Sequence, residues 1–62
     1  MLKKKIKDLT MKEVNAHQTA LFRFDTTVAF LLINGARTKN ALTFENLKMT
    51  IPSGLLNQEV VL

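Results

Sequence analysis

Side chains that could carry covalent chemistry are few and widely spaced in this sequence. His17 is the only imidazole, there is no cysteine or tyrosine, and Asp25, a carboxylate that could orient His17, lies eight residues away. In a helix that separation is roughly two turns. A hydrolytic triad needs nucleophile, imidazole and carboxylate to converge. We therefore predict that the chain is not an enzyme and takes no small-molecule substrate, and that His17 is a surface or packing residue.

The sequence also lacks the residues that usually bind a metal ion or a cofactor. One imidazole and scattered carboxylates do not supply the three or four convergent ligands that zinc requires. Neither Gly35 nor Gly54 stands in a phosphate-binding loop or a dinucleotide fingerprint. The sequence predicts no metal and no cofactor.

Positive charge is the clearest chemical bias of the chain. The net charge is +4, and five lysines gather near the N-terminus: Lys3, Lys4, Lys5, Lys7 and Lys12. Such a cluster favours a polyanionic partner, nucleic acid or an anionic membrane surface. The alternative is that residues 1–8 form a solvated arm that only aids solubility.

Aromatic residues offer a second possible contact with nucleic acid. Phe22 and Phe24 flank Arg23, an arrangement that can stack bases of a single strand if the segment is extended. A chain of 62 residues needs its large side chains in the core, however. We expect the four phenylalanines mainly to pack inside: Phe22, Phe24, Phe30 and Phe44.

Length and composition set the outer limits. A chain of 62 residues has room for one domain with one core, and a hydrophobic content of 47% favours a packed unit over a disordered one. The absence of cysteine excludes disulfides and fits a reducing compartment, so we expect a cytoplasmic protein. The longest apolar run, Val28 to Ile33, is far shorter than the roughly 20 residues that span a bilayer.

Helix signals dominate the first half of the chain. Thr10 and Glu13 form a capping box, and Leu9 can contact Val14 as a hydrophobic staple. An apolar stripe follows at spacings of three and four, interrupted by two polar residues: Val14, Gln18, Leu21, Asp25, Val28 and Leu32. Because Asp25 can cap a second helix, we predict helices near 11–24 and 26–34, the latter closed by Asn34-Gly35.

The second half predicts two shorter helices. Thr43 can cap a helix near 43–49, with Leu42 stapled onto Leu47. Pro52 suits a first helical turn, so a fourth helix can begin near 52 and run to the end of the chain. The expected fold is mainly α, a small bundle of three to four short helices.

A strand interpretation competes with the helices. Residues 14–24 alternate between apolar and polar types, Asn34-Gly35 is also a strong hairpin signal, and residues 47–51 alternate as well. An α+β or mostly β domain is therefore the alternative fold.

Residues 40–62 resemble a known DNA-binding motif. Leu42-Thr43 and an acidic residue precede Leu47, and Pro52-Ser53 opens the next segment, an order similar to the helix-turn-helix half of winged-helix domains. Winged-helix segments of cullin scaffold proteins, which make protein contacts, are similar too. Four residues separate Leu47 from Pro52, a shorter turn than in the family pattern, and no wing hairpin follows.

The resemblance implies a recognition helix near 52–59. It would place three polar side chains against base edges: Ser53, Asn57 and Gln58. Asparagine and glutamine suit adenine. The alternative is that the three are ordinary exposed residues of a helix.

The C-terminal residues Val60, Val61 and Leu62 are all apolar, where chain ends are usually polar and frayed. They can complete the core, pair as an edge strand or form a homodimer contact. A dimer would suit a DNA-binding module with two half-sites.

These observations lead to a functional hypothesis, a small basic DNA-binding regulator of the helix-turn-helix type that is dimeric. Its phosphate contacts would be Lys3, Lys4, Lys5, Lys7, Arg37 and Lys39. The alternatives are a protein-binding module, such as an inhibitor, an antitoxin-like factor or an adaptor, and a designed or selected chain without a natural role.

Overall fold

The computed structural model describes residues 2–62; Met1, the first residue of the predicted arm, lies outside them. In chain order the elements are β1 (Lys3–Lys5), the 3-10 turn η1 (Ile6–Asp8), α1 (Met11–Ala16), α2 (Gln18–Phe24), α3 (Thr26–Arg37), α4 (Ala41–Lys48), α5 (Ser53–Leu56) and β2 (Glu59–Val61). The predicted mainly α class is confirmed. A two-stranded antiparallel sheet joins the two ends of the chain.

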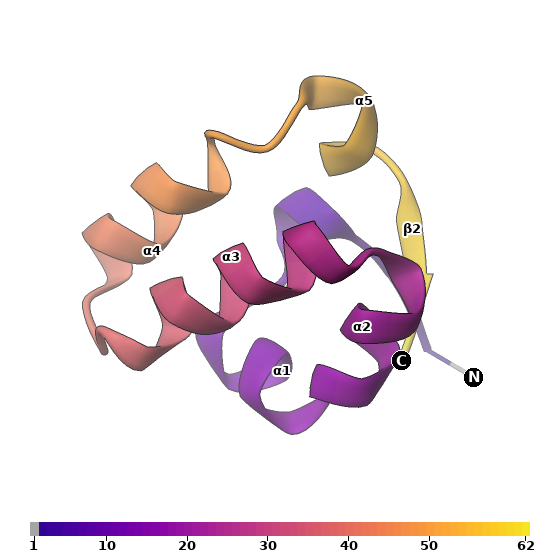
Figure 1. The fold of residues 1–62 in the computed structure, drawn as a ribbon, viewed down its shortest axis with the longest axis horizontal. Coiled ribbons are helices and arrows are strands. Elements are labelled where there is room, and N and C mark those ends of the chain that lie inside the picture. Colours follow the sequence, from indigo (N-terminus) through magenta and orange to yellow (C-terminus); the bar gives the residue numbers. More distant parts are fainter. Residues whose placement is uncertain (1) are drawn as a thin grey trace.

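Helix α3 is the longest element and organises the others. It crosses the middle of the molecule, with α4 at one end of it and the sheet, carrying both chain ends, at the other (Figure 1). Helices α1, α2 and α4 all contact α3. The core gathers apolar residues from nearly every element: Ile6, Leu9, Val14, Leu21, Val28, Ala29, Leu32, Ile33, Ala36, Phe44, Ile51, Leu56 and Val60.

The two predicted N-terminal caps of the first half are confirmed. Thr10 Oγ1 accepts the backbone N–H of Glu13 at 3.2 Å, and Glu13 Oε1 accepts the N–H of Thr10 at 3.1 Å, which together form the capping box of α1. Asp25 Oδ1 accepts the N–H of Val28 at 3.0 Å and starts α3. The predicted helix over 11–24 is broken at His17, so α1 and α2 change direction and each packs on α3.

The predicted helix end at Asn34-Gly35 is wrong, and the reason lies in packing. Helix α3 continues through Gly35 to Arg37, and Gly35 lies against Phe44 and Leu47 of α4. A Cβ atom on Gly35 would lie 3.2 Å from Phe44 Cδ1, closer than ordinary van der Waals contact. The left-handed residue that follows the helix is Lys39, with a φ of 54°.

Helix α4 begins two residues earlier than predicted. Asn40, rather than Thr43, is its cap, and the Asn40 side chain accepts the N–H of Thr43 at 3.0 Å. The predicted staple of Leu42 onto Leu47 is absent, because Leu42 is 73% exposed.

The fourth predicted helix begins as expected after Pro52 but does not reach the chain end. Helix α5 has one turn and ends at Leu56, and residues 59–61 extend as β2 instead. Pairing with β1 accounts for the change, in the register Lys3↔Val61, Lys4↔Val60 and Lys5↔Glu59. Residues 3–8 are accordingly folded onto the body of the protein, with Ile6 fully buried, and do not form the solvated arm that was the alternative.

The close approach at Gly35 yields a prediction about stability. Replacing Gly35 by Leu should lower the free energy of unfolding by about 1–3 kcal/mol, because the added atoms overfill the contact between α3 and α4. Gly54→Ala is the matched control, since a Cβ at Gly54 meets no atom within 4 Å. That variant should gain about 0.4–1 kcal/mol through the unfolded chain. Urea denaturation measures both, and equal stability of Gly35→Leu and the parent would contradict the tight contact.

Candidate nucleic-acid interface

Alternation along β1 separates its lysines into two environments. Lys3 and Lys5 are exposed on the outer face of the sheet, as side chains alternate across a strand. Lys7 follows in η1 and is also exposed. Among the described residues, no carboxylate lies within ion-pair distance of these three side chains. None of the three is held in an ion pair within residues 2–62, although Glu59 lies opposite Lys5 in the register of the sheet.

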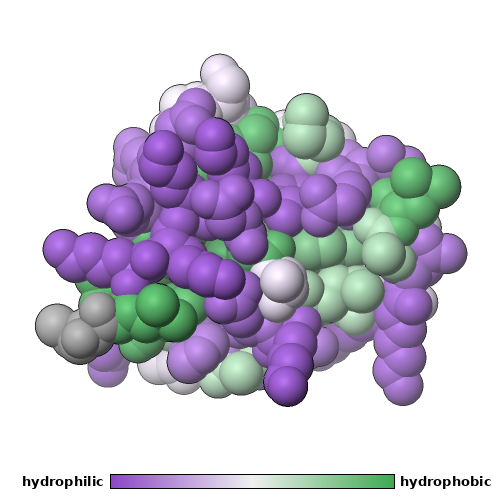
Figure 2. Space-filling model, turned by 180° about the vertical axis from the view of Figure 1, so that it is seen from behind, coloured by the Kyte–Doolittle hydropathy of each residue, from purple (hydrophilic) through white to green (hydrophobic). Residues whose placement is uncertain are grey.

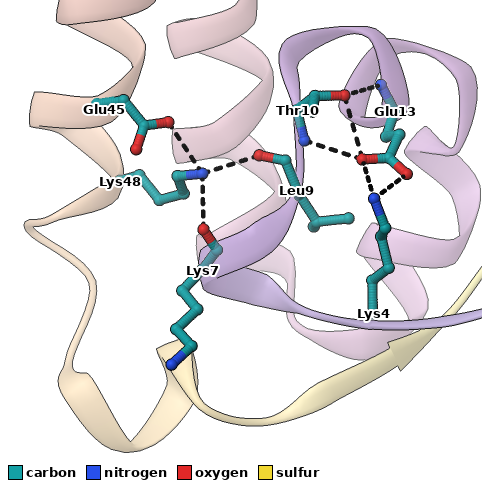
Figure 3. Close-up of polar contacts among 7 residues, drawn as sticks. All are labelled: Lys4, Lys7, Leu9, Thr10, Glu13, Glu45 and Lys48. Atoms are coloured by element: carbon teal, nitrogen blue, oxygen red, sulfur yellow. Dashed lines mark hydrogen bonds and ion pairs between the residues drawn. The ribbon is translucent and has the colours of Figure 1, made fainter.

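Lys4 points the other way and is already paired. Its Nζ lies 2.8 Å from Glu13 Oε2 and donates to Glu13 Oε1 at 3.0 Å. The same carboxylate accepts both polar hydrogens of Thr10, as Figure 3 shows. Of the predicted phosphate contacts, Lys4 is therefore occupied in holding β1 against α1.

These hydrogen bonds act on the Glu13 carboxyl. The bond from Lys4 is the main cause that lowers the pKa of Glu13 below its ordinary value, and the bond from the Thr10 backbone adds to it. Because hydrogen bonds to the charged form favour ionisation, the capping box and the ion pair strengthen each other.

Helix α5 brings the predicted base-contact residues to the same region. Ser53, Asn57 and Gln58 are all exposed, and the turn η1 contacts α5. The N–H of Ile6 donates to the Gln58 carbonyl at 3.0 Å, which joins the basic segment to this polar one. Asn57 Nδ2 donates to the Ser53 carbonyl at 3.0 Å, so part of the Asn57 amide is engaged locally.

Arg37 and Lys39 lie elsewhere. Both are exposed where α3 ends and the chain turns into α4, the end of α3 opposite to the sheet (Figure 1). The structure thus groups Lys3, Lys5 and Lys7 with Ser53, Asn57 and Gln58. We call these six residues the basic face. Arg37 and Lys39 lie apart from it. Lys12, exposed in the first turn of α1, was not among the predicted contacts.

The surface around η1 is largely hydrophilic. The turn η1 lies behind α3 in Figure 1 and therefore faces the reader in Figure 2, where hydrophilic residues cover most of the surface and apolar ones show at the lower left, in the right half and at the top.

A buried lysine that no local sequence pattern marks positions η1. Lys48 of α4 is only 4% exposed. Its Nζ donates to the Leu9 carbonyl at 2.8 Å and the Lys7 carbonyl at 3.0 Å, and lies 3.0 Å from Glu45 Oε2 (Figure 3). Nζ also lies 4.8 Å from the centroid of the Phe44 ring. The Lys7 backbone is thereby fixed while its side chain extends away from Lys48.

The aromatic residues differ from the expectation. Phe44 is buried, but Phe22 and Phe30 are 38% and 57% exposed and form a T-shaped pair with centroids 5.2 Å apart. Because α2 is a helix, Phe22 and Phe24 point about 200° apart, and Arg23 does not lie between stacked rings. The two exposed rings form a small apolar surface on α2 and α3.

Comparison of the chain with protein-family models, curated protein sequences and solved structures finds no match. Among the described residues, no helix has both the length and the apolar character needed to cross a membrane.

The buried ammonium leads to a second prediction. Lys48→Met keeps the apolar stem but leaves the Lys7 and Leu9 carbonyls without their donor, and should lower the free energy of unfolding by about 1–3 kcal/mol. Glu45→Gln should cost less than about 1 kcal/mol, because the Glu45 side chain is 58% exposed. Thermal or urea unfolding compares the two, and a larger loss for Glu45→Gln would contradict the role given to Lys48.

The Glu13 carboxyl leads to a third prediction, on pH. Since its pKa is lowered in the folded state, its stabilisation is fully present above the ordinary glutamate pKa of about 4.3 and is lost as pH falls through the lowered value. Glu13→Gln should therefore be less stable than the parent at pH 7, and the difference should shrink in acid. Melting curves of both proteins between neutral pH and about pH 2 measure it. A difference that stays constant across this range would rule out the linkage.

Proposed function

We propose that this chain is a small DNA-binding regulator that holds the phosphate backbone through its basic face. The observation that carries the proposal is that Lys3, Lys5 and Lys7 are exposed and form no ion pair among the described residues. They follow one another along β1 and η1, and η1, which carries Lys7, contacts α5. Two neighbouring lysines are already paired with carboxylates, Lys4 with Glu13 and Lys48 with Glu45. Free cations grouped on one rigid surface favour a polyanion.

We expect contacts with base edges to contribute less to DNA binding than contacts with phosphates. Helix α5 spans one turn, about 6 Å along its axis, so it offers little length to lie in a major groove. Asn57 and Gln58 are the side chains able to reach base edges beside the lysines. We therefore expect binding with modest sequence preference and strong dependence on salt.

The exposed Phe22–Phe30 pair favours a second candidate, a protein-binding module. Two large rings that remain 38% and 57% exposed are suited to contact an apolar partner surface. This contact would be nearly indifferent to salt, in contrast to phosphate binding.

The proposal is tested by fluorescence anisotropy of a labelled DNA duplex titrated with the protein at several salt concentrations. Three phosphate contacts predict a slope of log K against log salt of about −2.7, from 0.9 per contact. Lys5→Gln/Lys7→Gln should reduce the size of this slope by about 1.8. Arg37→Gln/Lys39→Asn is the matched control, because each double variant lowers the net charge from +4 to +2.

An unchanged slope in the control and a reduced slope in Lys5→Gln/Lys7→Gln support the basic face. Equal losses in both would show that Arg37 and Lys39 also contact DNA, or that net charge alone drives binding, and would contradict the localisation. Absence of binding at low salt would leave the protein-binding candidate, with Phe22 and Phe30 as its contact.

A further inference from the structure

One edge of the small sheet has unused hydrogen-bonding groups. In the ladder between β1 and β2, the Ile6 N–H donates to the Gln58 carbonyl and the Leu62 N–H donates to the Leu2 carbonyl at 2.8 Å. Backbone bonds of an antiparallel pair alternate along each strand. The backbone N–H and C=O groups of residues 58, 60 and 62 therefore face β1, and those of Glu59 and Val61 point away from it. No turn, cap or helix bond within residues 2–62 uses these four groups.

An open groove of about 610 Å³ lies along β2. Residues 59–62 line one side, and α2 with the end of α1 lines the other. Helix α2 contacts β2 at one part of the groove, and the helical side is lined by the small residues Ala16, Thr19 and Ala20 and by Arg23. The groove thus combines a free strand edge with space beside it.

The two edges of the sheet differ in how readily each could pair with a further strand. The edge of β1 carries Lys3, Lys4 and Lys5, and a second β1 strand beside it would set lysine against lysine. The edge of β2 carries Glu59, Val60 and Val61, with Val61 43% exposed. Charge repulsion protects the first edge, and the second lacks that protection.

We propose that β2 pairs antiparallel with β2 of a second copy of this chain, about a two-fold axis through Val60. In that register Glu59 lies opposite the partner's Val61, and Val61 lies opposite the partner's Glu59. The outward N–H and C=O groups of Glu59 and Val61 then all find partners, in four hydrogen bonds. The product is a four-stranded sheet in the order β1, β2, partner β2, partner β1.

Charge complementarity favours a second copy as the occupant. Symmetric pairing places the partner's Glu59 opposite Val61, which lines the same groove as Arg23, and the reverse arrangement forms on the other side. Val60 is already buried in the single chain, at 3% exposure, so the dimer covers Val61 and Leu62 and leaves the core unchanged. The pairing does not depend on DNA binding.

Sedimentation equilibrium tests the proposal on the intact chain. From about 10 µM to about 1 mM, the mass should rise from that of one chain, 7.0 kDa, toward twice that value. Val61→Pro should remain a single chain, because it removes an outward N–H that β1 does not use and proline is tolerated at such edge positions. Leu42→Ser removes an exposed apolar side chain on α4 and should associate like the parent.

Hydrogen exchange followed by NMR gives a readout that requires no substitution. The amides of Glu59 and Val61 should exchange rapidly in dilute protein and slow as the concentration rises, while the Val60 amide stays protected throughout. A parent chain that remains at 7.0 kDa at about 1 mM, or equal exchange of Glu59 and Val61 at both concentrations, would overturn the proposal. So would Val61→Pro associating as the parent does.

Discussion

The buried ammonium of Lys48 is the constraint on which the arrangement of the N-terminal segment depends. A charged group in the core is tolerated only when its donors are satisfied, and the three N–H donors of Lys48 have three oxygen partners. Two of these are backbone carbonyls of residues 7 and 9, which fix the chain immediately after β1. The path of that segment in turn sets where Lys5 and Lys7 emerge and where Ile6 enters the core. One side chain of α4 thus links the interior to the surface that carries the positive charge.

The small size of the protein explains why both chain ends are used structurally. Helices α1, α2 and α4 pack against α3, and Ile6 and Val60 complete the core from distant parts of the sequence. Val60 belongs to the sheet, and Ile6 follows β1 directly in η1. The sheet exposes Lys3 and Lys5 on one face while Lys4 pairs with Glu13 on the other. The three-residue strand β1 therefore contributes both an ion pair and surface charge.

The capping signals of the first half were read correctly from sequence, whereas the Asn40 cap of α4 and the non-local contacts were not. Thr10 and Asp25 cap helices as predicted, because a cap depends on residues within one turn. Gly35 was mistaken for a helix end, since the reason for a glycine there is Phe44 on another helix. Lys48 looks like an ordinary surface lysine paired with Glu45, and nothing nearby in sequence marks its burial. Of the predicted contact residues, Lys7 in η1 and Ser53 in α5 lie on elements in contact, whereas Arg37 lies at the C-terminal end of α3.

The pairing of β1 with β2 also orders events during synthesis. Lys4 is synthesised 56 positions before its partner Val60. Until then the nascent chain has no second strand, Ile6 and Leu9 lack part of their cover, and closure must wait for the most distant contact in the fold. Helices α1 to α4 can form while translation continues, but the fold is completed only when β2 is free of the exit tunnel and pairs with β1.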